Sequence, residues 1–145
     1  MSLPASDDLL HSPGAETNFN ESMYFNFYDR TQDVGGFLRI GNRVNEGHAE
    51  MTLCVYLPGG HALFDFARAP MVDDLAFATG EMAFEALEPL LRHRTTYKGT
   101  PIEMADPLVL ADPGTAFRNS PRAELSLDLV HEATGPMFEP PPYGL

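Results

Sequence analysis

Apolar and polar residues alternate along most of the chain between residues 21 and 133, with the period of two that is typical of β-strands. The stretch AEMTLCVYL is the clearest case, because every second residue from Ala49 to Leu57 is apolar. The stretch RAELSLDLVHEA repeats the pattern with Leu125, Leu127 and Leu129. We expect these leucines to face the interior of a sheet and the residues between them to face water.

A bulkier strand is expected at ESMYFNFYD. The alternation divides its side chains into two sets, Met23, Phe25 and Phe27 on one face and Tyr24, Asn26 and Tyr28 on the other. Both sets are large, so we expect one face to fill a barrel and the other to be covered. Asn is uncommon in strands, so Asn26 indicates either a contact to a ligand or a bond to nearby backbone.

Turn signals separate the expected strands. Pro58, Gly59 and Gly60 predict a hairpin between AEMTLCVYL and HALFDFAR. Residues 81–91, EMAFEALEPLL, fit either a helix or a strand, and the neighbouring strands favour a strand. Further turns are expected at MVDD and in the proline-rich connection of residues 100–121, and the last strand is expected to stop near Ala133.

These signals predict an all-β fold of about eight antiparallel strands, closed or incompletely closed into an up-and-down barrel. Residues 1–20 are polar and are interpreted as an extended N-terminal arm. Residues 21–133 form the barrel domain, and residues 134–145 are a proline-rich tail or linker. A barrel of this size has an interior suited to a small hydrophobic molecule.

The charge balance excludes some partners. There are 21 Asp and Glu against 9 Lys and Arg, a net charge of -12, which repels nucleic acid and anionic lipid. Cys54 is the only cysteine, so no intrachain disulfide forms. No apolar run approaches the roughly 18 residues of a membrane span. The first residues do not resemble a signal peptide, so a cytoplasmic location without membrane insertion is expected.

Three segments carry a resemblance to a known family: ESMYFNFYD, GGFLRIGNRVNEGHAEMTLCVYLPGG and EMAFEALEPLLRHRTTYKG. Together they resemble the N-terminal half of the hydroxyneurosporene-synthase-like proteins, the carotenoid 1,2-hydratase group, and more narrowly an uncharacterised bacterial branch of it. The resemblance runs over residues 16–140 and is most distinctive over residues 35–60. It implies a lipocalin-like, calycin-type barrel and, in the best-known members, hydration of an isoprenoid double bond.

The resemblance covers one barrel, whereas the family has two in tandem with an apolar site in or between them. We therefore expect either a fragment of a two-barrel protein or a chain that completes itself with a second barrel domain or as a homodimer.

Hydration of an alkene needs a carboxyl group kept protonated by apolar surroundings. The candidates are Asp65, Glu85 and Asp128, which lie on otherwise apolar strands. Alternation with Phe64 and Leu127 predicts that Asp65 and Asp128 face solvent, so no catalytic residue is assigned.

The candidate ligand-binding residues are polar or aromatic side chains on the expected strands: Tyr24, Asn26, Tyr28, Arg39, Asn42, Tyr56 and His93. Arg39 and Asn42 belong to RIGNRVNEG, which is interpreted either as a polar rim that binds a carboxylate or hydroxyl, or as a turn in which Arg39 pairs with Glu50. His93 shares a face with Tyr97, so we expect it in the interior.

Metal and cofactor chemistry are not indicated. The histidines show no HxH or HExxH spacing, and Cys54 has no basic neighbour to activate it. The glycines of GGFLRIG precede no helix, and there is no GxSxG turn. Three hypotheses remain: a domain that binds a small hydrophobic molecule, a hydratase or isomerase (a hydro-lyase) acting on an isoprenoid, and a non-catalytic half of a two-barrel protein.

Overall fold

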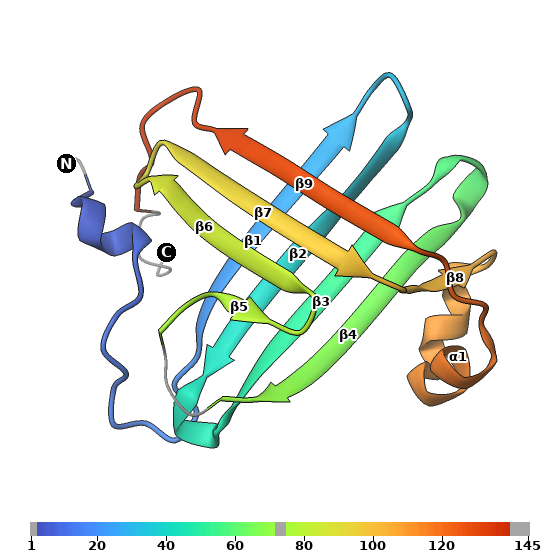
Figure 1. The fold of residues 1–145 in the computed structure, drawn as a ribbon, viewed down its shortest axis with the longest axis horizontal. Helices are drawn as coiled ribbons and strands as arrows, with labels where there is room; N and C mark the ends of the chain where they lie inside the picture. The colour runs from blue at the N-terminus through green and yellow to red at the C-terminus, as the bar shows by residue number, and fades with distance from the viewer. Residues whose placement is uncertain (1–2, 72–74, 140–145) are drawn as a thin grey trace, which may run out of the picture.

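Two antiparallel sheets face each other and cross at an angle (Figure 1). The computed structural model describes residues 3–71 and 75–139. Sheet A has the strand order β1-β2-β3-β4-β8, and sheet B has the order β5-β6-β7-β9. The strands of sheet A are β1 (Glu21–Asp29), β2 (Val34–Arg43), β3 (His48–Tyr56), β4 (Ala62–Pro70) and β8 (Ile102–Met104). The strands of sheet B are β5 (Ala78–Thr79), β6 (Met82–Glu88), β7 (Arg92–Gly99) and β9 (Leu125–Glu132).

The all-β antiparallel fold expected from the sequence is confirmed, and the barrel is incomplete. On one side the chain passes from β7 in sheet B into β8 in sheet A. The pairing with the segment before β9 continues across this bend, from Gly99 opposite Leu125 to Ile102 opposite Arg122. On the other side, no ladder joins β1 to β9 within residues 3–71 and 75–139. The molecule is therefore two sheets joined along one side.

The space between the sheets is filled by the chain's own side chains. Sheet A contributes side chains from β2, β3 and β4, and sheet B contributes side chains from β6 and β7. The largest are Leu38, Ile40, Met51, Leu53, Met82 and Tyr97, each at most 2% exposed. Burial of each such aliphatic side chain stabilises the fold by about 1.5–3 kcal/mol. The apolar interior that the alternation predicts is present, and it is packed.

The N-terminal arm is anchored rather than simply extended. It contains a short 3-10 helix, η1 (Ala5–Asp8), and Leu10 packs against the core. Asp8 Oδ2 accepts a hydrogen bond from Leu90 N at 2.6 Å and lies 2.6 Å from His93 Nε2. The arm therefore covers one end of the space between the sheets.

The proline-rich connection contains two short helices, the 3-10 helix η4 (Pro107–Ala111) and α1 (Pro113–Asn119). A proline begins each helix, where no backbone N–H is needed, and an aspartate caps it. Asp112 accepts a hydrogen bond from Thr115 N at 3.2 Å. Alternation does not reveal these helices because each is only one or two turns long.

Several local expectations agree with the structure. Residues 82–88 form a strand, and the Pro-Gly-Gly turn forms the 3-10 helix η3 (Pro58–Gly60) between β3 and β4. A further 3-10 helix, η2 (Val44–Glu46), joins β2 to β3. The turn expected at MVDD falls largely on residues 72–74, which, like residues 140–145 of the expected tail, lie outside the described part of the chain. In the described ranges, no helix combines the length and apolar character that crossing a membrane requires.

Candidate functional site

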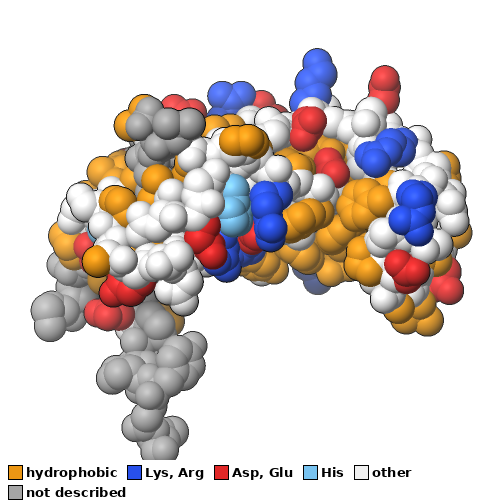
Figure 2. Space-filling view, turned by 90° about the horizontal axis from the view of Figure 1, so that it is seen from below, with side chains coloured by type: hydrophobic (Ala, Val, Ile, Leu, Met, Phe, Trp, Pro, Cys, Tyr) orange, Lys and Arg blue, Asp and Glu red, His pale blue; other side chains and the backbone are white. Residues whose placement is uncertain are grey.

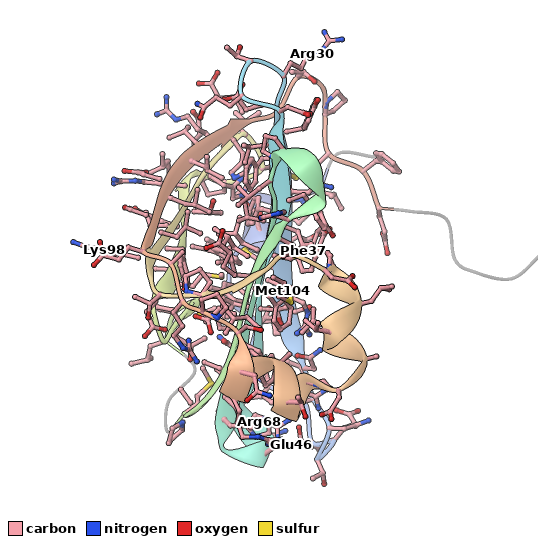
Figure 3. All side chains as sticks on the ribbon, turned by 90° about the vertical axis from the view of Figure 1, so that its right-hand side faces the viewer. Arg30, Phe37, Glu46, Arg68, Lys98 and Met104 are labelled. Carbon is pink, nitrogen blue, oxygen red and sulfur yellow. The ribbon has the colours of Figure 1, made fainter. Side chains whose placement is uncertain are left out.

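The face of sheet A that points away from sheet B carries the candidate site, and we call it the outer face. Residues such as Leu38 and Leu53 pack against sheet B, so their neighbours along the strands face outward. Sheet B and α1 lie on opposite sides of sheet A (Figure 3). Four cross-strand rows lie on the outer face: Tyr28, Gly35, Tyr56 and Ala62; Asn26, Phe37, Cys54 and Phe64; Tyr24, Arg39, Thr52 and Phe66; and Ser22, Gly41, Glu50 and Arg68.

An open groove of about 650 Å³ lies on the outer face over β1, β2 and β3. We call it the tyrosine groove, and its lining is Tyr24, Asn26, Phe27, Tyr28, Gly35, Gly36, Phe37 and Tyr56. The rings of Tyr24 and Phe37 stack with their centroids 5.5 Å apart. A Cβ at Gly35 would lie 3.1 Å from Tyr28 Cδ2, so the glycine lets this ring lie close to the backbone. The groove is thus a largely aromatic surface.

Two of the groove tyrosines, Tyr28 and Tyr56, have raised pKa values. The hydrogen bond from Tyr28 to Asp33, 2.8 Å long, raises the pKa of Tyr28. Burial raises the pKa of Tyr56, and the neighbouring Cys54 adds to this shift. Because the Tyr28 proton is engaged with Asp33, this hydroxyl can accept a hydrogen bond from a guest at the edge of the groove.

A second apolar depression, of about 430 Å³, lies on the same face between β4 and the two helices of the connection. We call it the phenylalanine pocket, and its lining is Phe64, Phe66, Leu110, Pro113 and Phe117. The rings of Phe64 and Phe117 lie 5.9 Å apart. Apolar side chains gather toward the end of the molecule that carries α1 (Figure 2). Cys54 lies between Phe37 and Phe64, so both depressions belong to one continuous face.

Three arginines gather at one end of the outer face, and we call Arg39, Arg43 and Arg68 the arginine cluster. They surround Glu50: Arg68 Nη2 donates to Glu50 Oε1 at 2.8 Å, Arg43 Nε lies 3.7 Å from Oε2, and Arg39 Nη1 lies 3.8 Å from it. Arg43 also pairs with Glu46 at 2.7 Å. The pairing of Arg39 with Glu50 that the sequence suggested is present, at a distance longer than a hydrogen bond.

The structure divides the seven ligand-binding candidates between two places. Tyr24, Asn26, Tyr28 and Tyr56 line the tyrosine groove, and Arg39 stands beside Tyr24 in the same row. Asn42 and His93 face the interior and hold other segments in place. Asn42 Nδ2 donates to the carbonyl of Ala76 at 3.0 Å, and His93 contacts Asp8. These two residues are separated from the groove by the sheet itself.

His93 belongs to a small group of polar side chains, with Thr95 and His131, on the inner face of sheet B. It pairs across strands with His131, whose Nε2 lies 3.1 Å from Thr95 Oγ1. Burial lowers the pKa of His131, and the charge on His93 lowers it further. The ring of Phe25 packs against both imidazoles, at 5.4 Å from His93 and 4.7 Å from His131. The group is well packed, and it lies at the end of the molecule that the arm covers.

The expectation that Asp65 faces solvent is wrong. Asp65 stands opposite Leu53 and faces the interior, where its Oδ2 accepts a 2.7 Å hydrogen bond from Tyr97. Burial raises the pKa of Tyr97, and the hydrogen bond to Asp65 raises it further. Both faces of β4 carry apolar side chains, and on the outer one Phe64 packs against Phe117 while Phe66 remains 42% exposed. Alternation with Phe64 and Phe66 therefore could not identify the inner face. Asp128 does face outward, where Arg94 donates hydrogen bonds of 2.8 Å and 2.7 Å to it.

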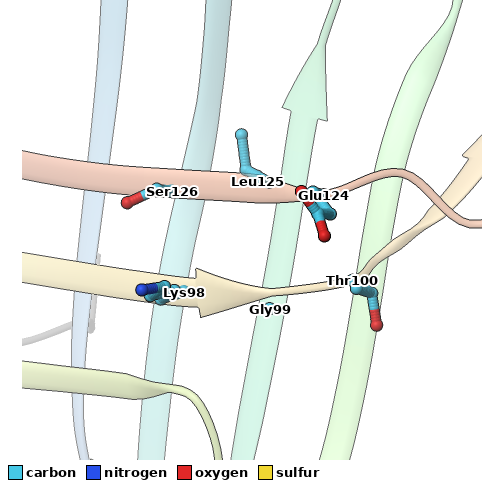
Figure 4. A pocket seen from close by; sticks show the side chains of 6 residues that line it. All are labelled: Lys98, Gly99, Thr100, Glu124, Leu125 and Ser126. Carbon is cyan, nitrogen blue, oxygen red and sulfur yellow. The ribbon is translucent and has the colours of Figure 1, made fainter.

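Sequence reasoning did not place Phe37, Phe64 and Phe66 beside the tyrosines, and it did not join Arg43 and Arg68 to Arg39. Their alternation was visible in the sequence, but the cross-strand register that brings them together was not. A depression of about 660 Å³ lies where β7 ends beside the start of β9 (Figure 4), and its lining is Lys98, Gly99, Thr100, Glu124, Leu125 and Ser126. It includes none of the candidate residues.

Possible metal ligands are dispersed and the Cys54 thiol is buried in the part of the chain that the structure describes. There, no three His, Cys, Asp or Glu side chains gather in a way that could hold a metal ion. Cys54 is 7% exposed, and burial raises its pKa, which leaves it a poor nucleophile.

The fold and the outer face together define a class: a two-sheet antiparallel β protein with an exposed aromatic surface on one sheet. The chain belongs to a family described as Domain of unknown function (DUF7064), whose model matches residues 4–144. No curated protein matches the chain. No solved structure matches it either.

Proposed function

We propose that this protein binds a small, largely apolar molecule on the outer face of sheet A, in the tyrosine groove. One observation carries the proposal: Tyr24, Tyr28 and Tyr56 surround one groove and are 56%, 64% and 53% exposed. Single exposed aromatic residues are common on protein surfaces, whereas a contiguous aromatic patch is typical of a binding site. The stacked pair of Tyr24 and Phe37 offers a flat wall for such a molecule.

The energetics favour this surface over the interior. A guest between the sheets would have to displace side chains such as Leu38 and Met51, which are fully buried. A guest in the groove displaces only water and gains about 25 cal/mol for each Å² of apolar surface covered. Tyrosine rings have few rotatable bonds, so ordering them on binding costs little entropy. Their hydroxyls, with the Asn26 amide, then orient the guest.

Intrinsic tyrosine fluorescence tests the proposal directly. The chain has no tryptophan and five tyrosines, three of which line the groove, so the signal reports largely on this site. We expect a saturable change when 1-dodecanol or the isoprenoid alcohol geranylgeraniol is added below its aggregation concentration. Tyr24→Ala should weaken binding about tenfold, in proportion to the aromatic area removed.

Val130→Ala is the matched control, because Val130 is 56% exposed on the far side of sheet B. It should leave binding unchanged. Absence of saturable binding by either alcohol, or equal effects of the two substitutions, would refute the proposal. A dimer in sedimentation that Tyr24→Ala dissociates and that excludes the alcohols would replace it with docking between two copies of the chain.

A second candidate function follows from Asp65. Among the three carboxyl groups considered for alkene hydration, this one points into the apolar interior, next to the Tyr97 hydroxyl. An inward carboxyl group is one requirement of the hydratase that the resemblance to the carotenoid 1,2-hydratase group implies, and a substrate would have to displace packed core side chains to reach it. The protein would be incubated with acyclic isoprenoids and the products examined for added water. Activity lost in Asp65→Asn would support this function, and no activity above a denatured control would exclude it.

A further inference from the structure

We infer that the molecule bound on the outer face carries an acidic head group, which the arginine cluster receives while the aromatic rows hold its apolar body. The inference rests on the proposed function and adds the chemical class of the ligand. It makes the outer face a site for amphiphilic acids, such as a long-chain or isoprenoid carboxylate.

Cross-strand register places the two halves of this site side by side. Arg39 stands directly opposite Tyr24 on β1 and opposite Thr52 on β3. The aromatic surface of the groove and the cationic end therefore meet without an intervening row. A Cβ at Gly41 would lie 2.8 Å from Arg39 Nη2, so the guanidinium lies over the glycine, toward the row of Glu50 and Arg68.

The arginine cluster gathers positive charge on a molecule whose net charge is negative. The whole chain has nine Lys and Arg and a net charge of -12, yet three of the nine gather here. Among residues 3–71 and 75–139, two carboxylates, Glu46 and Glu50, pair with these three arginines, so these ion pairs hold one more positive than negative group. An acidic head group would complete the neutralisation, and the acidic surroundings would steer it to this end alone.

Glu50 holds the arginines in place. Burial tends to raise its pKa, but the hydrogen bond from Arg68 and the charges of Arg43, Arg68 and Arg39 outweigh burial and lower it. Glu50 is therefore ionised and shared among three guanidinium groups. Arg39 has the longest contact with it, 3.8 Å, and keeps donors available for a carboxylate.

The dimensions suit an extended chain. From the row of Tyr28 to the row of Ser22, β1 advances six residues, which is about 20 Å along a strand. A linear acyl or isoprenyl chain could lie along this length with its head at the cluster. The phenylalanine pocket continues the apolar surface toward β4 and α1.

Three dodecyl compounds that differ only in the head group test the inference by calorimetry with the full chain, below their micelle concentrations. They are dodecanoate, 1-dodecanol and the dodecyltrimethylammonium cation. We expect dodecanoate to bind about tenfold more tightly than the alcohol, with a preference that falls as salt is raised. The cation should bind more weakly than the alcohol.

Arg39→Gln should remove the preference for dodecanoate and leave the affinity for 1-dodecanol unchanged. Arg94→Gln is the matched control, since Arg94 lies on the opposite sheet and pairs with Asp128. Equal binding of acid and alcohol, a preference for the cation, or a preference that survives Arg39→Gln would overturn the acidic head group while the proposed function stands. Failure of all three compounds to bind would instead refute the proposed function.

Discussion

On sheet B, the side chains that point away from the core form a charged surface. Arg94 and Asp128 make a two-bonded ion pair there, and Glu85 and Lys98 are exposed nearby. On sheet A, the corresponding outward positions hold tyrosines and phenylalanines, with charge confined to the arginine cluster at one end. Both surfaces come from strands with the same alternation. Contact with water accounts for the charged outer side of sheet B, whereas the aromatic outer face of sheet A is the surface on which we propose that a ligand binds.

The largest expected effects come from substitutions on the two faces of one strand, β2. Leu38 is fully buried between the sheets and its neighbour Phe37 lines the groove. Leu38→Ala should lower the free energy of unfolding by about 2–5 kcal/mol, since it leaves a cavity in the core. Phe37→Ala should cost less stability but weaken binding of 1-dodecanol. Urea denaturation and calorimetry on both variants measure this, and a larger loss of stability from Phe37→Ala would contradict the assignment of faces.

Cys54 offers a chemical probe of the outer face. The single thiol lies between Phe37 and Phe64, largely buried and with a raised pKa, so it should react slowly with a disulfide reagent such as DTNB. Phe37→Ala should accelerate the reaction on the order of tenfold by exposing the sulfur. Saturating dodecanoate should slow it in the unaltered protein. A ligand that leaves the rate unchanged would place its binding elsewhere.

A smaller effect is expected on the pH dependence of stability, and it should come from His131 on the inner face of sheet B. The pKa of His131 is lowered in the folded protein from its ordinary value of 6.5, so the unfolded chain binds a proton more readily. Stability should therefore fall as the pH drops below about 6.5 and recover as the pH rises. Denaturation midpoints at pH 5 and pH 8 measure the change. His131→Gln should flatten this part of the profile, and an unaltered profile in that variant would exclude His131 as the cause.

The smallest effect is expected on the charged surface of sheet B. Arg94 and Asp128 are exposed, and ion pairs of this kind contribute little to stability in water. Arg94→Gln should leave both the denaturation midpoint and the binding of 1-dodecanol unchanged. A measurable loss of binding would remove the distinction between the two outer faces.

Most of the strands could be predicted from the sequence because their signal is local. Alternation in AEMTLCVYL and the Pro58-Gly59-Gly60 turn each depend on a few adjacent residues. The closure of the barrel could not be predicted, since it depends on whether β1 meets β9, at opposite ends of the chain. The inner face of β4 was misassigned for a related reason: Phe64 and Phe66 face outward although they are apolar, and the contact of Phe64 with Phe117 of α1 is not visible in the sequence.

The candidate site was predictable in part. Tyr24, Asn26 and Tyr28 share a face by alternation alone, and this grouping is present in the groove. The same rule, applied to β2, separates Arg39 from Asn42, because an odd spacing puts them on opposite faces. The meeting of Arg39 with Arg43 and Arg68 at Glu50 depends on register between strands, which one sequence does not reveal.

The anchoring of the arm has a consequence for how the protein is made. Asp8 meets His93, 85 positions further along the chain. During synthesis, the arm leaves the ribosome before β7 does, so it cannot make this contact until β7 has followed it. The arm is therefore fixed late although it is made before the sheets, and until then this end of the core is open to water.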